Sequence, residues 1–398
     1  MAVVALHRNA AYRWLWISYT LSSIGTLASF ASLPLLVLHS FDSPAAVGLV
    51  SFAGAAVLLL AMPWAGLFVD RVGWREVMIG SDLIRAAAMA LLTLCIAGDQ
   101  LSLSLVLAVT VVNSALSVPF MSATGAALRA SVEATQLSTA LALNQGRTAV
   151  IGILGPVGGT ALYAYSHGLP FAVDAASFLL SALCVCAMGA TAEVPATRPG
   201  LRWPDVTAGW RFLRGHPFLR YMALNVIVMD FSINGVVLVL VVNSSADGGS
   251  LGAGVVMAVA GAGNLLGSTV ALTAMRRVRL RTLVLILVWV AAVCTPLIAA
   301  HGGMLWGAAL VGATCVTVPI VAVLTNTKVL EETPTHLLGR VQSVFQTVPR
   351  LVAATGPACA GVLLSLLPAP AVLLLFAVPL AALAVHSTGL PALRASES

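Results

Sequence analysis

The chain has 398 residues, of which 60% are hydrophobic and 9% are charged, and its mean hydropathy is +1.01. A domain with an ordinary water-exposed surface needs more polar residues, so this composition excludes a soluble protein and indicates an integral membrane protein. The formal net charge is +6, which we attribute to basic loops on the cytoplasmic side of a membrane and not to nucleic-acid binding.

Apolar runs long enough to cross a bilayer follow one another along the whole chain. A spanning helix needs about 20 mainly apolar residues, because only an internally hydrogen-bonded backbone tolerates hydrocarbon. The runs are too long, and alternate too little, for a β-barrel. We therefore predict an all-α integral membrane protein of twelve transmembrane helices, arranged as two parallel six-helix bundles. The helices are expected at residues 14–38, 45–69, 76–97, 102–124, 137–165, 169–190, 217–242, 251–275, 280–300, 303–327, 338–366 and 369–390.

The distribution of arginine and lysine predicts the orientation of these helices. The loops near 39–44, 98–101, 166–168, 243–250, 301–302 and 367–369 contain neither residue, whereas the alternate loops contain most of the arginines. Because basic residues are retained on the cytoplasmic side, we expect both termini to be cytoplasmic. The expected location is a bacterial inner or plasma membrane.

All six cysteines fall inside the predicted helices. Cys184 and Cys186 are two residues apart and therefore point to different faces of a helix, which favours neither a disulfide framework nor a zinc site. We interpret the cysteines as small packing residues, and we predict no metal and no cofactor.

A polar segment divides the chain into two halves. Residues 191–216 interrupt the hydrophobic runs with prolines and arginines, and we predict that they form a cytoplasmic linker with a short interfacial helix. The predicted domains are an N-terminal bundle, 1–190, and a C-terminal bundle, 217–398.

An internal repeat supports this division. "LNQGRTAVIGILGPVGG" contains Gln145 and Gly155-Pro156, and "SVFQTVPRLVAATGPACAG" contains Gln346 and Gly356-Pro357, each pair 201 residues apart (346−145 and 356−155). Six predicted helices separate the copies, so the two halves have the same orientation in the membrane.

The loop between the second and third predicted helices concentrates charge in a chain that has little of it. It contains Gly66, Asp70, Arg71, Gly73 and Arg75, a pattern that resembles the loop signature of the major facilitator superfamily. The resemblance implies that Asp70 locks the two halves on the cytoplasmic side when the transporter faces outward. The expected gating residues are Asp70, Arg71, Arg75, Arg129 and Arg340. Trp74 departs from the family pattern, and the alternative is that the loop is only a positive-inside anchor.

The resemblance extends over essentially the whole chain. "RNAAYRWLWISYTLSSIG", "DRVGWREVMIGSDLIRA", "VDAASF", "GWRFLRGHPFLR" and "LLGRVQSVFQTV" resemble, in order, the branch that includes enterobactin exporters and macrolide efflux pumps. Within this resemblance, the "GPVGG" segment is similar to a motif of drug-exporting antiporters. Gly155, Pro156, Gly159, Gly356 and Pro357 are expected to bend and pack helices between the two halves, the alternative being a small-residue seam without directional meaning.

A charged residue inside a spanning helix raises the free energy of insertion by about 3 kcal/mol or more near the bilayer centre, so its presence needs an explanation. Asp230 lies thirteen residues beyond Pro217, about 20 Å along a helix and near the midplane. We predict that Asp230 couples transport to protons, with a fixed ion pair as the alternative. All seven histidines lie in loops or at helix ends, which disfavours a histidine proton relay.

Polar residues on the fifth and eleventh predicted helices are expected to line the substrate path. They are Asn144, Gln145, Arg147, Gln346 and Arg350. The arginines are candidate partners for Asp230 or for an anionic substrate.

We interpret the remaining polar residues of the predicted helices either as part of a cavity wall or as structural. Ser18, Ser22, Gly25, Thr26 and Ser29 recur on one side of the first helix, as in a hydroxyl-bearing cavity wall. Asp82 and Arg85 are expected to form a local ion pair, and Asp174 to favour a helix N-terminus.

Together these features predict a proton-coupled exporter that moves a drug, siderophore or secondary metabolite by alternating access. The alternatives are a proton-linked uptake symporter for a small metabolite and a non-transporting membrane receptor. The chain contains no GxxxxGK[ST] loop and no HExxH pair, so we expect no enzyme activity. The expected partners are the substrate, protons and membrane lipid, and the expected state is a monomer.

Overall fold

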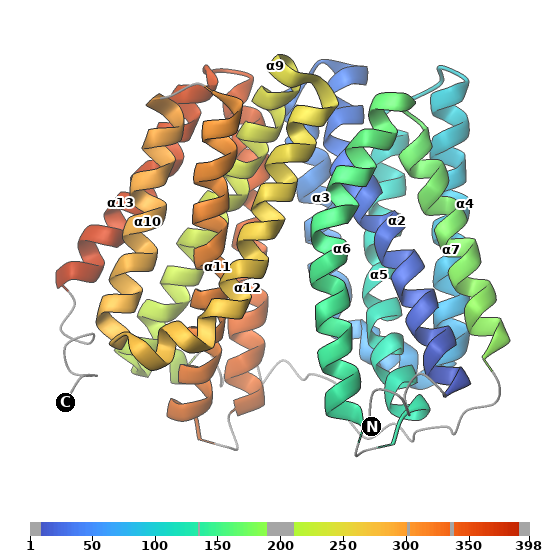
Figure 1. Ribbon diagram of the computed structural model, residues 1–398, viewed down its shortest axis with the longest axis horizontal. Helices are drawn as coiled ribbons and strands as arrows, with labels where there is room; N and C mark the ends of the chain where they lie inside the picture. Colours follow the sequence, from blue (N-terminus) through green and yellow to red (C-terminus); the bar gives the residue numbers. More distant parts are fainter. Residues whose placement is uncertain (1–8, 134–135, 189–210, 301–302, 335–337, 390–398) are drawn as a thin grey trace. The chain divides into compact units, whose positions relative to one another are not determined.

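The computed structural model describes residues 9–133, 136–188, 211–300, 303–334 and 338–389, and their regular structure is helical (Figure 1). This confirms the all-α prediction for the described part of the chain. The helices are α2 (Ala10–Phe41), α3 (Pro44–Val72), α4 (Trp74–Ala97), α5 (Leu103–Ser131), α6 (Leu137–Tyr165), α7 (Leu169–Ala187), α9 (Pro217–Arg277), α10 (Leu280–Ala300), α11 (Met304–Glu332), α12 (Leu338–Leu364) and α13 (Ala369–Gly389).

Within the described ranges, 11 helical segments are long and apolar enough to cross a membrane. The one remaining predicted span, the eleventh (338–366), corresponds to α12, whose shorter apolar part is Leu351–Leu364. Several helices are longer than predicted. For example, α5 continues to Ser131 and α11 continues to Glu332, because charged residues at an end can leave hydrocarbon without ending the helix.

Helix α9 contains two of these spans, Pro217–Ser244 and Gly252–Arg277. A Cβ placed on Gly252 would lie 2.6 Å from the carbonyl oxygen of Ser244, whereas residues eight positions apart in a straight helix are separated by about 12 Å. The chain therefore folds back between the two spans, as Figure 1 shows at the label α9. The two spans match the predicted seventh and eighth helices.

The surface of the helices is apolar, as contact with lipid requires. Leu60 and Leu305 are 71% and 72% exposed, and Phe30, Trp64 and Leu94 are also exposed. A row of such side chains in water would lead to aggregation, whereas in hydrocarbon it costs nothing. Together with the number of spans, this surface identifies a multi-pass membrane protein.

The chain forms two compact units. The first comprises Met1–Phe41 and Ala53–Gly200, and the second comprises Asp42–Phe52 and Leu201–Ser398. Most of the predicted linker, 191–216, lies outside the described residues, which resume at residue 211. The expected interfacial helix and the exact domain limits therefore stay predictions.

In the first unit, α2 contacts α5, α6 and α7, and α4 contacts α5 and α7. The approach of α6 to α2 depends on glycine, because a Cβ on Gly159 would collide with the backbone of Ala28. Gly155 likewise faces the side chain of Leu27. These glycines therefore pack against α2 of the same unit, and not between the two halves as the sequence predicted.

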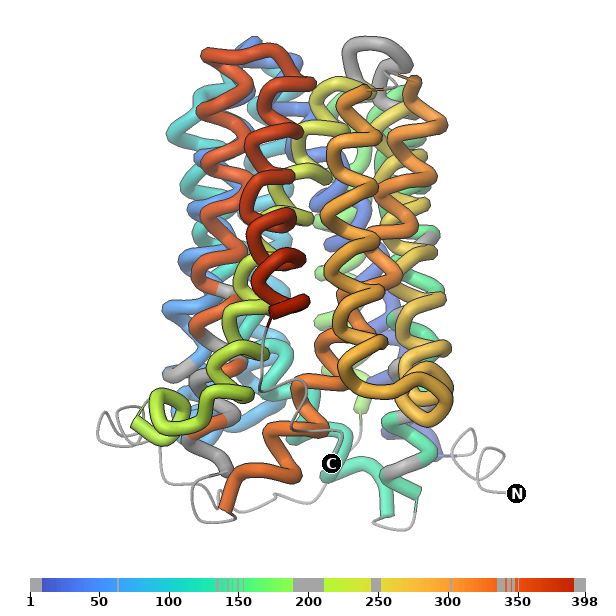
Figure 2. The backbone as a smooth tube through the Cα atoms, turned by 90° about the vertical axis from the view of Figure 1, so that its left-hand side faces the viewer, coloured from blue at the N-terminus to red at the C-terminus, as the bar shows by residue number. Residues whose placement is uncertain are grey.

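In the second unit, α9 contacts α11, α12 and α13, and α10 contacts α11 and α13 (Figure 2). A Cβ on Gly356 of α12 would collide with the carbonyl oxygen of Phe231 in the first span of α9. Gly356 is the repeat equivalent of Gly155, and each packs on the first spanning helix of its own half. The internal repeat thus extends to this packing contact. Pro357, in contrast, does meet the N-terminal half of the sequence as predicted, because its carbonyl oxygen lies 2.8 Å from a Cβ placed on Gly48 of α3.

The Gly159 contact can be tested by adding one methyl group. We expect Gly159→Ala to lower the unfolding temperature of the detergent-purified protein, because overpacking a close contact costs about 1–3 kcal/mol. Gly158→Ala is the matched control, since a Cβ on Gly158 meets nothing within 4 Å. Equal unfolding temperatures for the two variants would show that α6 can move away from α2 at this contact without a loss of stability.

Candidate functional site

The loop between α3 and α4 turns at Gly73, whose φ of 101° lies in the left-handed region that favours glycine. Asp70 and Arg71 are exposed beside this turn, and Arg129 is exposed near the end of α5. Arg340 is helical, but its side chain lies outside the described part of the structure. The predicted gating contact between Asp70 and Arg340 therefore stays a prediction.

Arg75 holds this loop to the end of α7. One guanidinium nitrogen, Nη2, donates hydrogen bonds to the carbonyl oxygens of Cys186 (2.8 Å) and Met188 (2.7 Å). These are carbonyl groups at the helix C-terminus, which have no partner within the helix and attract a cation. The structure thus gives Arg75 an anchoring contact that the sequence did not predict.

Asp230 lies within the first span of α9 and is partly exposed. Its carbonyl oxygen accepts a 2.7 Å hydrogen bond from Nδ2 of Asn234, one turn later. Its placement within a span agrees with the expected position along the helix, and its role in coupling stays a prediction.

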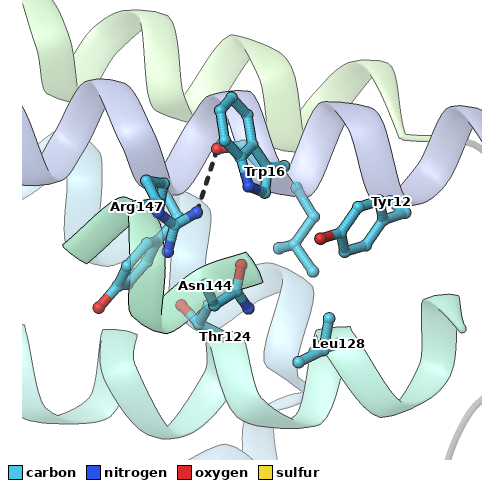
Figure 3. Close-up of a pocket in the computed structure, with 8 residues that line it drawn as sticks. Tyr12, Trp16, Thr124, Leu128, Asn144 and Arg147 are labelled. Atoms are coloured by element: carbon cyan, nitrogen blue, oxygen red, sulfur yellow. Dashed lines mark hydrogen bonds between the residues drawn. The ribbon is translucent and has the colours of Figure 1, made fainter. Parts of the chain in front are cut away.

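Arg147 lines a small pocket in the first unit (Figure 3). The pocket is formed by α2, α5 and α6, through Tyr12, Leu15, Trp16, Tyr19, Thr124, Leu128, Asn144 and Arg147. Of the predicted path residues, Asn144 and Arg147 are therefore brought together. The side chains of Gln145, Gln346 and Arg350 lie outside the described part of the structure.

The guanidinium of Arg147 contacts neutral groups. Nη1 donates a 3.4 Å hydrogen bond to the carbonyl oxygen of Trp16, and the guanidinium carbon lies 4.2 Å from the ring centre of Tyr19. Arg147 is 9% exposed, and its Nε has no hydrogen-bond partner among the described residues. A buried cation without a carboxylate partner is costly, so this pocket is suited to an anionic group.

A second polar cluster lies between α4 and α7 of the first unit. Asp82 and Arg85 form the predicted local pair, with 4.0 Å between Oδ1 and Nη1. This confirms the pair. Asp174 of α7 is fully buried and interacts electrostatically with Arg85, so it takes part in a network and is not only a helix-terminal charge.

The hydroxyl groups of α2 belong to the packing between helices. Ser18 and Ser181 share a 2.8 Å hydrogen bond, Ser29 donates to the carbonyl oxygen of Pro170 (3.3 Å), and Thr26 accepts from Arg85 (3.1 Å). The predicted cavity wall is therefore wrong for these residues, since their hydroxyls bond to α7 and α4. Gly25 fits the same seam, because a Cβ there would collide with Ser177 and Asp174.

Two histidines lie close together where α2 ends and the loop joins α6 to α7. His167, between α6 and α7, lies with its ring centre 4.5 Å from that of His39 and 4.8 Å from that of Tyr163. Burial lowers the pKa of His167 from its ordinary value of 6.5, and the neighbouring His39 acts in the same direction. His39 lies in the last turn of α2 and His167 in the loop between α6 and α7, as expected from the sequence.

Comparison with known proteins places these features in a family. The sequence model of the Major Facilitator Superfamily matches residues 15–357. An uncharacterized MFS-type transporter of Bacillus subtilis (strain 168), YfiS, is 28% identical over 269 residues, which are 66% of this chain and 63% of that protein. The match thus spans less than two thirds of that relative.

Solved transporter structures share the fold. The nucleoside transporter NupG superimposes with a TM-score of 0.75 at 13% identity, covering 96% of this chain and 98% of that chain. A bacterial homologue of the iron transporter ferroportin, in an inward-facing state, gives a TM-score of 0.69 at 14% identity, covering 95% and 99%.

The histidine pair predicts a pH dependence of stability. Because the pKa of His167 is lower in the folded state, the unfolded chain binds more protons below about pH 6.5, and stability falls as the pH decreases through that range. We expect His167→Asn to weaken this fall in thermal unfolding of the purified protein. His386→Asn, on α13, is the control, and an unchanged pH profile in His167→Asn would contradict the prediction.

Proposed function

The chain belongs to the major facilitator superfamily, and we propose that it is a proton-coupled exporter of small amphipathic compounds such as a drug, a siderophore or a secondary metabolite. As a member of this superfamily it is a membrane transporter with a small-molecule substrate. The proposal concerns the direction of transport, the coupling ion and the class of substrate. We further propose that it works by alternating access, as a monomer with cytoplasmic termini, in a bacterial inner or plasma membrane.

The pocket around Arg147 is the observation that carries the substrate class. Aromatic rings of Trp16 and Tyr19 provide apolar surface, Asn144 provides an amide, and Arg147 provides a buried positive charge with an unused N–H group. In this structure the pocket has room for little more than one small polar group, so the acidic oxygen of a compound is the part that would enter it and contact Arg147. We therefore propose that the substrate carries a carboxylate or a comparable acidic group.

The direction of transport is supported by the sequence resemblance to exporters. Gly155, Pro156 and Gly159 occur in the segment that resembles the antiporter motif, and α6, which carries this segment, also carries Asn144 and Arg147. Bending or sliding of α6 along α2 would therefore move pocket residues directly. Uptake by proton symport is the alternative, and NupG, which has the same fold, is a nucleoside transporter.

Gating and coupling follow the sequence prediction. In this proposal Asp70 with Arg340 closes the cytoplasmic side, and Asp230 alternates between protonated and ionised forms. Both roles depend on a carboxylate whose surroundings change between the two states of the transporter.

Proton movement in inverted membrane vesicles with an acid interior tests the direction and the coupling. We expect acidic antibiotics and siderophores to trigger proton efflux in the wild type and not in Asp230→Asn, because asparagine cannot exchange a proton. A protonophore serves as the control for each compound. Proton entry together with compound movement would contradict export and support symport, and efflux that persists in Asp230→Asn would remove this residue from coupling.

The substrate class is tested at Arg147. Loss of a hydrogen bond to a charged group costs about 1.5–3 kcal/mol, so Arg147→Gln is expected to raise the apparent KM for an acidic compound about 10- to 100-fold. Labelled-compound accumulation in the same vesicles measures this change. Arg13→Gln, at an exposed position of α2, is the matched control. Equal KM values for the two variants would exclude Arg147 from binding the acidic group.

A further inference from the structure

Two carboxyl groups and one guanidinium are buried together in the first unit, apart from the pocket described above. Asp82 and Asp174 have no exposed surface, and Arg85 is 2% exposed. Arg85 interacts electrostatically with both carboxyl groups. If all three groups were ionised, the cluster would carry a net charge of −1.

The hydrogen bonds of Arg85 do not neutralise the two carboxyl groups. Its Nε donates to Oδ1 of Asn113 (2.5 Å), Nη2 donates to Thr26, and the guanidinium carbon lies 3.9 Å from the ring centre of Phe178. The closest approach to Asp82 is 4.0 Å, beyond hydrogen-bond distance. The arginine therefore makes its short contacts with neutral groups.

The carboxyl oxygens are poorly satisfied. Both oxygens of Asp82 and Oδ2 of Asp174 have no hydrogen-bond partner among the described residues. Oδ1 of Asp174 accepts a long hydrogen bond, 3.4 Å, from Ser177. An ionised carboxylate in hydrocarbon surroundings needs several such donors, so two ionised carboxylates here would be strongly unfavourable.

Among the side chains that the structure describes, the helices around the cluster add no compensating charge. The polar groups that face it are neutral: Thr26 and Ser29 of α2, Asn113 of α5, and Ser177 and Ser181 of α7. Arg147, the cation of α6, has its electrostatic interactions with Tyr19 and Tyr12. One proton placed on the carboxyl pair removes the net charge and converts one acceptor into a donor.

We propose that Asp82 and Asp174 share one exchangeable proton, so that the cluster with Arg85 is a proton-binding site of the first unit. Its role in transport rests on the proton coupling proposed above, whereas the shared proton can be measured without transport. The site is additional to Asp230, which belongs to the other unit.

A series of ring contacts joins this site to the pocket. The guanidinium carbon of Arg85 lies 5.9 Å from the ring centre of Phe120, and Phe120 stacks on Tyr19 with 6.4 Å between ring centres and 7° between planes. Tyr19 in turn lies against Arg147. When the shared proton leaves, Arg85 is drawn toward the ionised carboxylates and away from Phe120, so the proton site and the pocket act on each other through this stack.

The shared proton is tested by infrared difference spectroscopy of the purified protein in lipid nanodiscs. We expect a carbonyl band of a protonated carboxylic acid that shifts in deuterated water, and that is absent from both Asp82→Asn and Asp174→Asn. Each variant keeps one carboxylate to pair with Arg85, so both should unfold close to the wild-type temperature. Asp99→Asn is the matched control, because Asp99 is exposed and has a φ of 50°, which asparagine tolerates well.

The outcome for transport is measured in the same vesicles. We expect Asp82→Asn and Asp174→Asn to reduce compound-triggered proton flux at least tenfold while labelled compound still exchanges across the membrane without a gradient.

A wild-type spectrum without the band, or a band that survives in both variants, would overturn the shared proton. If the band is present but no compound moves protons in the wild type, the site stands and the proposed antiport fails. If antiport is observed and depends on Asp230 but the band is missing, the proposed function stands and this site fails.

Discussion

Hydrocarbon offers no hydrogen-bond partner to a peptide group, and this constraint determines both the helices and the places where polar side chains occur. Each backbone N–H of a spanning segment must find its acceptor within the same helix. Polar side chains are then tolerated where they meet one another, as Ser18 meets Ser181 and Arg85 meets Asn113. The functional groups of the first unit therefore lie in the seams between helices and not on the lipid surface.

The same constraint explains the small residues. Without a hydrophobic force to bring helices together in lipid, close packing supplies the attraction, and glycine permits the closest approach. Gly159 against Ala28 and Gly356 against Phe231 hold the fifth and eleventh spans to the first spanning helix of each half. In the first unit this seam positions α6, and with it Arg147.

The fold could be predicted because it depends on the number, length and order of apolar runs, which the sequence contains directly. The pair of Asp82 and Arg85 could also be predicted, since residues three apart on a helix are neighbours. The inclusion of Asp174 could not, because it requires knowing that α4 and α7 are adjacent. A signal was present nonetheless: Asp174, Ser177 and Ser181 form a polar stripe on one face of α7, opposite the hydroxyl stripe of α2.

The contact of Arg75 with the end of α7 was invisible in the sequence for a different reason: its acceptors are carbonyl oxygens of Cys186 and Met188, and every residue type supplies one. The consequence concerns mutational tolerance. At positions 186 and 188 the anchor depends on the backbone and not on the side chains, whereas at position 75 it depends on the long and permanently charged side chain of arginine. Homologous chains should therefore vary freely at 186, where the side chain is exposed, keep a large apolar residue at 188, where Met188 is buried in the core, and retain arginine at 75.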